Sequence, residues 1–247
     1  MTTRYKLVLE YDGTNYHGWQ QQPGQPTIEA AVKDALARIT GERPHLQAAG
    51  RTDAGAHSLG QAISFSLERE MDSARLRSGM NAVLPRDVAV RDAEVVDAGF
   101  HARFSARLRT YRYLVENRAE RGALLRDRAW HVRQPLDLLA MRSAATPLLG
   151  EHDLAAFGTD PAGRNTVREL HGLRVRALRG AVSPLLAFDL TANAFLYGMV
   201  RRMVGFLVEV GLGRRPASEA STLLRPGATA GSRVAPAHGL YQMVIQY

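Results

Sequence analysis

The sequence predicts an α+β protein made of two similar halves that share one sheet. Segments in which apolar and polar residues alternate, as in half-buried strands, are interleaved with segments of helical period along the whole chain. The order strand, helix, strand, helix, strand fills the first hundred residues, and the same theme then returns. At 247 residues and 45% hydrophobic composition, the chain suits one large or two small domains. We place the halves at residues 1–105 and 106–247, with the joint near 98–110.

Each half is defined by its own set of expected elements. In the first half Thr27 can cap a helix that Gly41 ends, and Pro85 stops a second helix. The elements of this half are a strand, a helix, a strand, a helix and a strand over residues 5–11, 28–39, 63–67, 76–84 and 88–96. The second half is expected to hold strands at 111–115, 173–178, 185–192 and 240–247 and helices at 138–149 and 195–210.

Two connections in the second half stand out. Gly180 joins two of the expected strands, and residues 158–168 are rich in Gly, Pro, Asp and Asn. We expect this second interval to be a mobile loop.

Basic residues are concentrated in the second half. The formal net charge is +8 and the pI about 10.3. Residues 1–100 carry 11 basic and 13 acidic side chains, whereas residues 101–247 carry 21 and 11. Thirty of the 32 basic residues are arginine, which suits phosphate contacts, although GC-rich codon usage explains part of that preference. The asymmetry predicts a polyanionic partner, with nucleic acid as the first candidate.

The composition also excludes several classes of protein. The absence of cysteine excludes disulfide scaffolds, thiol nucleophiles, iron–sulfur clusters and cysteine-ligated zinc. The apolar run at 203–212 is interrupted by Glu209 and is shorter than the ~18–20 residues of a membrane span. A strand pattern begins directly at the N-terminus, so no signal peptide is expected. We expect a cytoplasmic protein with no membrane contact.

The most distinctive stretch is Gly50-Arg51-Thr52-Asp53-Ala54-Gly55-Ala56-His57. Its glycines allow positive φ and close approach of a ligand, so the Asp53 carboxylate could be exposed beside the Arg51 guanidinium. Ordinary Asx-turn structure is the alternative explanation. Asp53 and His57 stand four residues apart, as metal ligands do, but no further cluster completes a metal site.

Two further segments are candidates for function. Arg201 lies on an otherwise apolar helix with Gly198 and Gly205 on its face, which allows another backbone or a ligand to come close. Its charge calls for a carboxylate partner, in a structural ion pair or in one that orients a catalytic aspartate. Tyr111 and Tyr113 share one face of a strand and Arg112 the other, which suits either base stacking or core packing. The same choice applies to Trp19 and to the basic and aromatic segment at 100–106.

Taken together these motifs resemble the TruA family of bacterial tRNA pseudouridine synthases, and the similarity runs nearly end to end. Two positions depart from the family pattern: Ala56 stands where valine is frequent, and Gly198 where histidine is common. The matching pieces are Glu10-Tyr11-Asp12-Gly13, Gly18-Trp19-Gln20, Gly50 to Gly55, Asn81-Ala82, Leu84-Pro85, Phe100 to Ala106, Tyr111-Arg112-Tyr113 and Met199-Val200-Arg201.

The resemblance implies an enzyme that isomerises uridine to pseudouridine at positions 38 to 40 of the tRNA anticodon stem-loop, without metal or cofactor. It implies that Asp53 is the nucleophile or electrostatic partner of the reacting nucleoside and that Tyr111 stacks on the target uracil. It further implies that Arg201 pairs with Asp53 and that Arg51 fills the space left by the extruded base.

The resemblance also implies two ferredoxin-like (RRM-like) halves with one long mixed or antiparallel sheet, helices on one face and a catalytic cleft between the halves. A homodimer that binds one tRNA with both subunits is expected. Two other classes stay open. One is a non-catalytic RNA-binding protein that tolerates Asp53→Asn. The other is a metal-dependent nuclease that uses Asp53, His57 and His17.

Overall fold

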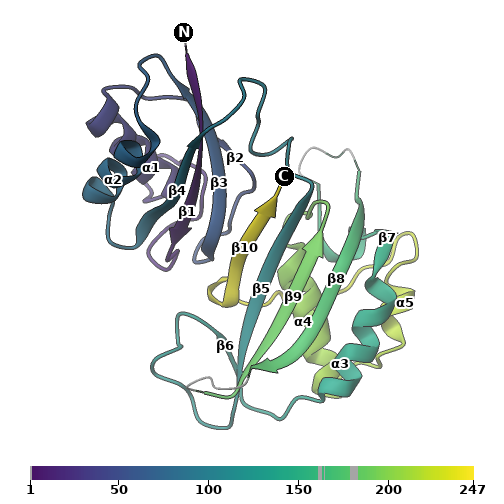
Figure 1. Ribbon diagram of the computed structural model, residues 1–247. Coiled ribbons are helices and arrows are strands. Elements are labelled where there is room, and N and C mark those ends of the chain that lie inside the picture. The colour runs from purple at the N-terminus through teal and green to yellow at the C-terminus, as the bar shows by residue number, and fades with distance from the viewer. Residues whose placement is uncertain (1, 161–162, 164, 179–182) are drawn as a thin grey trace. The chain divides into compact units, whose positions relative to one another are not determined.

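The computed structural model describes residues 2–160, 163, 165–178 and 183–247 and has the predicted α+β character (Figure 1). The chain divides into two compact units. The first unit contains the chain up to Arg107 together with the closing segment from Tyr241, and the second unit contains residues 108–240. The closing strand therefore lies in the first unit, whereas the sequence analysis places it in the C-terminal half. The reason is its pairing, because Tyr241 stands opposite His57 in a parallel ladder.

The first unit is a mostly antiparallel sheet with two helices. The strands lie in the order β4-β1-β3-β10, with β2 on β3, and only the pair of β10 and β3 is parallel. The elements are β1 (Thr3–Tyr11), α1 (Ile28–Thr40), β2 (Gln47–Ala48), β3 (His57–Leu67), α2 (Ser73–Val83), β4 (Val88–Val95) and β10 (Leu240–Gln246).

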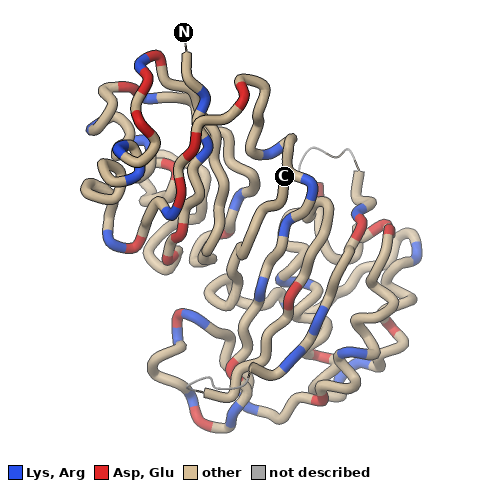
Figure 2. The backbone as a smooth tube through the Cα atoms, viewed as in Figure 1, with Lys and Arg blue, Asp and Glu red and all other residues tan. Residues whose placement is uncertain are grey.

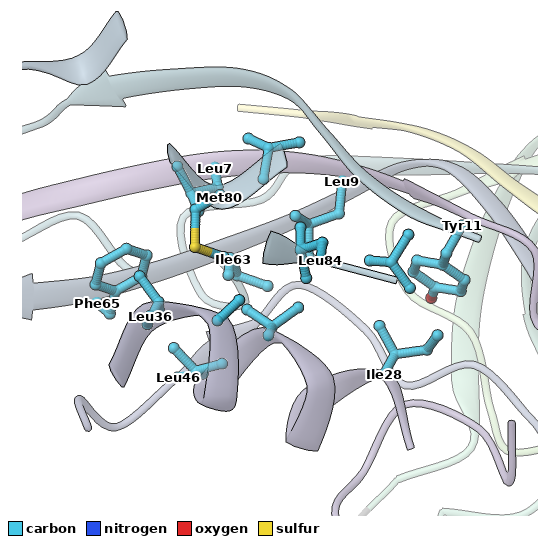
Figure 3. Packing of buried hydrophobic residues seen from close by; sticks show 14 of the residues in the cluster. Leu7, Leu9, Tyr11, Ile28, Leu36, Leu46, Ile63, Phe65, Met80 and Leu84 are labelled. Carbon is cyan, nitrogen blue, oxygen red and sulfur yellow. The ribbon is translucent and has the colours of Figure 1, made fainter. Parts of the chain in front are cut away.

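The helix α1 has its two predicted caps, whereas α2 starts earlier than predicted. The Oγ1 atom of Thr27 accepts a hydrogen bond from the Ala30 amide, and Gly41 ends α1 with φ of 79°. The helix α2 begins three residues before its predicted start, because the Asp72 carboxylate caps it by accepting from the Arg75 amide at 2.9 Å. Figure 3 shows the core that results, with apolar side chains of β1 and β3 facing those of α1.

The second unit is built in the same way from β5, β9, β8 and β7 in that order, all antiparallel, with β6 parallel to β5. Its strands are β5 (Leu108–Asn117), β6 (Trp130–Val132), β7 (Gly150–Asp153), β8 (Val167–Leu178) and β9 (Leu185–Ala192), and its helices are α3 (Leu138–Ala145), α4 (Met199–Gly211) and α5 (Glu219–Thr222). In the part of the chain described here, no helix is long and apolar enough to cross a membrane.

Two predicted helices of this unit are shorter than expected. The helix α3 stops at Ala145 and continues as a 3₁₀ turn over Thr146–Leu148, because Pro147 lacks an amide hydrogen for the next α-helical bond. The helix α4 starts only at Met199, since Gly198 has φ of 72° and Tyr197 forms a β-bridge with Thr159.

Parts of two expected connections cannot be compared. The expected turn residue Gly180 and residues 161, 162 and 164 of the expected mobile loop at 158–168 lie outside the described residues. In the described flank of that loop, β8 already begins at Val167.

Candidate active site

The loop that carries Asp53 is a tight turn directly before β3. The Ala56 amide donates to the Asp53 carbonyl at 3.1 Å, and Gly55 takes the positive φ of 78° that the turn requires. The side chain of Asp53 is half-buried and that of Arg51 is exposed. Beside them Thr52 is buried, and its hydroxyl lies 2.8 Å from the hydroxyl of Tyr11. The turn is therefore tied to the end of β1.

Two glycines of the segment that follows β1 hold this loop by close backbone contact. A β-carbon on Gly18 would lie 2.6 Å from the Thr52 carbonyl oxygen, and one on Gly13 would lie 1.9 Å from the Ala56 carbonyl oxygen. Hydrogen bonds add to the contact, since the Trp19 amide donates to Thr52 at 3.1 Å. We call residues 12–19 the clasp. In the sequence these glycines are visible only as family motifs; in the structure they leave room for the Asp53 loop to pack against residues 12–19.

A tyrosine anchors the clasp to the body of the first unit. The Tyr16 hydroxyl donates to the Asp87 carboxylate at 2.6 Å, and the Tyr16 carbonyl accepts from the Gly55 amide at 3.1 Å. Burial, followed by the hydrogen bond to Asp87 and its negative charge, raises the pKa of Tyr16 far above its usual value. The phenol therefore stays a neutral donor.

His57 and His17, the two histidines of the alternative nuclease site, have different surroundings. The side chain of His57 is only 3% exposed, and its Nδ1 atom lies 3.1 Å from the Gly13 amide and 3.2 Å from Asp12 Oδ1. His17 is exposed. Among the described residues, no group of three or more histidine, aspartate or glutamate side chains is placed to hold a metal ion. Trp19 is 3% exposed and its ring centroid is 6.4 Å from that of Tyr11, so it packs in the core.

The second unit carries Tyr111 and Arg201. Tyr111, 8% exposed, lies on β5 and packs edge-on against Phe195, with ring centroids 4.9 Å apart. Tyr113 is fully buried on the same face and donates its hydroxyl to the Pro236 carbonyl at 2.6 Å, whereas Arg112 lies on the opposite face beside Asp189. The predicted division of the two faces is confirmed.

Arg201 lies on α4 and bonds to the chain that crosses this helix. Its Nε donates to the Ala235 carbonyl at 2.7 Å. A β-carbon on Gly205 would lie 1.8 Å from the Arg233 carbonyl oxygen, so the predicted close approach of another backbone is confirmed. Gly198, one of the two positions expected to depart from the family pattern, takes the left-handed conformation at the start of α4. Glycine suits that conformation better than histidine does.

The basic and aromatic segment at 100–106 is only partly packed. Phe100 contacts Tyr247, with ring centroids 4.8 Å apart, whereas Phe104 is 74% exposed. His101 organises the turn between them, because its Nδ1 accepts from the Arg103 amide at 3.1 Å.

Comparison with known proteins identifies the family of this chain. The family model of the tRNA pseudouridine synthases matches residues 7–105 and 144–247. Proteins named tRNA pseudouridine synthase A include one from Geobacter sulfurreducens, 41% identical over 98% of each chain, and one from Syntrophotalea carbinolica, 42% identical over 98% of this chain and 95% of its own. A third, from Myxococcus xanthus, is 45% identical over 90% of this chain and 83% of its own.

These matches define the class of protein as an isomerase that acts on uridine in tRNA. The chain belongs to the tRNA pseudouridine synthase family, as its motifs predict.

Proposed function

We propose that this protein converts uridine to pseudouridine at positions 38 to 40 of the tRNA anticodon stem-loop, with Asp53 as the catalytic carboxylate and without metal or cofactor. The observation that carries the proposal is the clasp. Two glycines and several backbone hydrogen bonds hold the turn that carries Asp53, so its carboxylate is positioned before substrate arrives. Membership of the family supplies the class of reaction.

The reaction is a balanced rearrangement of one nucleoside. The bond between C1′ and N1 breaks, the uracil rotates, C5 bonds to C1′, the proton on C5 passes to water, and N1 takes up a proton from water. Asp53 either adds transiently to C6 of the base or to C1′, or stabilises the charge that develops there. A carboxylate is suited to a transient adduct because the bond it forms can break again.

The other residues bind and position the nucleoside. Tyr111 stacks on the extruded uracil, Arg201 pairs with Asp53, and Arg51 fills the space left in the RNA stack. The exposure of Arg51 supports its role, and the Tyr111 side chain, packed against Phe195, keeps 8% of its surface exposed.

The assembly we propose has two ferredoxin-like halves, one long sheet and a catalytic cleft between the halves, and it works as a cytoplasmic homodimer. The matches of the family model in two separate segments support the two-part organisation. The net charge of +10 over residues 101–247 supports a tRNA-binding surface in that half, with affinity that falls as salt rises.

The test uses tRNA transcripts with tritium at C5 of uracil and EDTA throughout. Wild-type protein is expected to release tritium to water, and Asp53→Asn is expected to release none while it still binds tRNA. The matched control is Asp34→Asn, because Asp34 is 63% exposed on α1 and pairs at the surface with Arg43. Release by Asp53→Asn at the wild-type rate would contradict the proposed role. Salt-sensitive binding without release by the wild type would leave an RNA-binding protein, and RNA cleavage that EDTA stops would indicate a nuclease.

A further inference from the structure

The sheet face of the second unit that carries Arg112 presents a cluster of guanidinium groups around one carboxylate. Asp189 on β9 stands directly between Arg112 on β5 and Arg174 on β8. Its Oδ1 accepts from Nε of Arg112 at 2.6 Å, and its Oδ2 accepts from Nε of Arg176 at 3.0 Å. Two guanidinium groups on one carboxylate, with the exposed Arg174 opposite it in the ladder, leave an excess of positive charge. In Figure 2, basic positions lie along β5 and β8 on either side of an acidic position on β9.

We propose that Arg112, Arg174 and Arg176 form a phosphate clamp, oriented by Asp189, that binds the backbone of the substrate RNA. The inference rests on the proposed function for the nature of that RNA. The clamp is separate from the catalytic residues, because Tyr111 lies on the opposite face of β5.

The geometry of the ion pairs favours a ligand over a purely structural role. A guanidinium has five N–H donors, and Asp189 engages the Nε of each partner, so the Nη donors beyond Nε can serve a second acceptor. The side chains of Arg112 and Arg176 are 31% and 44% exposed, and that of Asp189 is 19% exposed. Asp189 thus fixes two long side chains in advance, which lowers the entropic cost of binding an anion.

The neighbouring residues suit a sugar–phosphate chain. One row away, the hydroxyls of Thr110 and Thr191 lie 2.9 Å apart, and Gly172 stands opposite Thr191 with no side chain to obstruct approach. Small and hydroxylated residues beside arginines can contact ribose and phosphate groups without reading the bases.

The first experiment removes two charges and keeps the fold. In the double variant Arg174→Gln/Arg176→Gln, Asp189 retains Arg112, so its carboxylate stays paired. We expect KM for tRNA to rise roughly tenfold with kcat nearly unchanged, as two surface phosphate contacts are lost. The slope of log Kd against log[KCl] should fall by about 1.4–1.8. The matched control is Arg214→Gln/Arg225→Gln, two exposed arginines of the same unit that follow α4 and α5.

The second experiment locates the RNA directly. The chain has no cysteine, so Arg174→Cys introduces a single attachment point for an azidophenacyl photo-cross-linker. We expect cross-linking to tRNA, with only background from Arg214→Cys.

Three results would overturn the clamp: binding and KM that match the control double variant, absence of a cross-link, or a change of oligomeric mass in the double variant. The last would mean that this face contacts protein. Filter binding of tRNA needs no turnover, so a wild-type protein that binds through the clamp but releases no tritium would refute the proposed function alone.

Discussion

Arg201 and Ala235 are joined by two hydrogen bonds in opposite senses. The Nε of Arg201 donates to the carbonyl of Ala235 at 2.7 Å, and the amide of Ala235 donates to the carbonyl of Arg201 at 3.1 Å. One edge of this guanidinium is therefore committed to the backbone that crosses α4. A residue assigned to the active site by resemblance is also a structural residue of the second unit, so its substitution has two effects.

We predict that Arg201→Lys lowers both stability and activity. Lysine has no Nε–H donor, so the Ala235 carbonyl loses its charged partner, at a cost of about 1–2 kcal/mol in the free energy of unfolding. Tritium release should also fall, because Arg201 is proposed to pair with Asp53. Urea unfolding and the tritium assay measure the two effects, with the exposed Arg214→Lys as control. Unchanged stability would show that the bond to Ala235 contributes little.

We predict that Gly18→Ala displaces the Asp53 loop. An alanine here must adopt φ of 85° and would place its β-carbon 2.6 Å from the Thr52 carbonyl oxygen. The control is Gly24→Ala, which requires φ of 71° but, apart from its chain neighbours, has no atom of the described residues within 4 Å of the new β-carbon. Both variants carry the strain of positive φ, about 1–2 kcal/mol, and only the first carries the clash.

The readout of this pair is kcat for tritium release. We expect a loss of roughly 100-fold in Gly18→Ala, because misplacement of a catalytic group by about 1 Å has that effect. Gly24→Ala should stay close to wild type. Equal values of kcat in the two variants would show that the clasp does not position Asp53.

We predict that mild acid destabilises the turn at 101–105. Its cap requires an unprotonated His101, whose Nδ1 accepts from the amides of Arg103 and Phe104 at 3.1 and 3.4 Å. Desolvation first, then the positive charge of Arg4, lowers the pKa of His101 below the ordinary 6.5. As pH falls below about 6.5 the unfolded chain takes up the proton before the folded protein does. Stability is therefore full above that pH and is lost as pH falls through the lowered pKa.

The measurement is urea unfolding between pH 7.5 and 5. The decline should be shallower in His101→Gln than in wild type. It should persist in part, because burial also lowers the pKa of His238. His17→Gln, at an exposed position, is the control for replacing a histidine by glutamine. An identical decline in His101→Gln and wild type would contradict the prediction.

The sequence predicts local structure well where a cap or a strict alternation specifies it. The helix α1 begins after Thr27 and ends at Gly41 as expected, and the alternation around Tyr111 places Arg112 on the opposite face. Propensity cannot show the pairing of β10 with the first unit, because that depends on a contact between residues 57 and 241. Strands of two to four residues, such as β2 and β7, are too short to show a period.

The candidate site divides in the same way. Asp53 stands out in the sequence because the residues next to it, Gly55 among them, specify its turn. The clasp does not, because the need for Gly13 and Gly18 arises only when a loop some 40 residues away packs against them. The constraint becomes visible only in the structure, where a backbone oxygen lies close to the position that a β-carbon would occupy.

We predict opposite effects for alanine at two helical glycines. Alanine favours a helix over glycine by roughly 0.5–1 kcal/mol. In α2 the atoms nearest to a β-carbon on Gly79 would belong to Ile39, at 3.6 Å and beyond, so Gly79→Ala should stabilise the protein by about that amount. In α4 a β-carbon on Gly205 would lie 1.8 Å from the Arg233 carbonyl oxygen, so Gly205→Ala must push the crossing chain away.

The expected loss in Gly205→Ala is about 2–4 kcal/mol, beyond the usual range for overpacking, because the obstacle is backbone rather than a movable side chain. Since residues 233–235 also hold Arg201, tritium release should fall with stability in this variant but not in Gly79→Ala. Thermal or urea unfolding gives the sign for each variant. If the Gly205→Ala protein were more stable than wild type, the chain that crosses α4 would be free to move. The bond from Arg201 to Ala235 would then not be what positions Arg201.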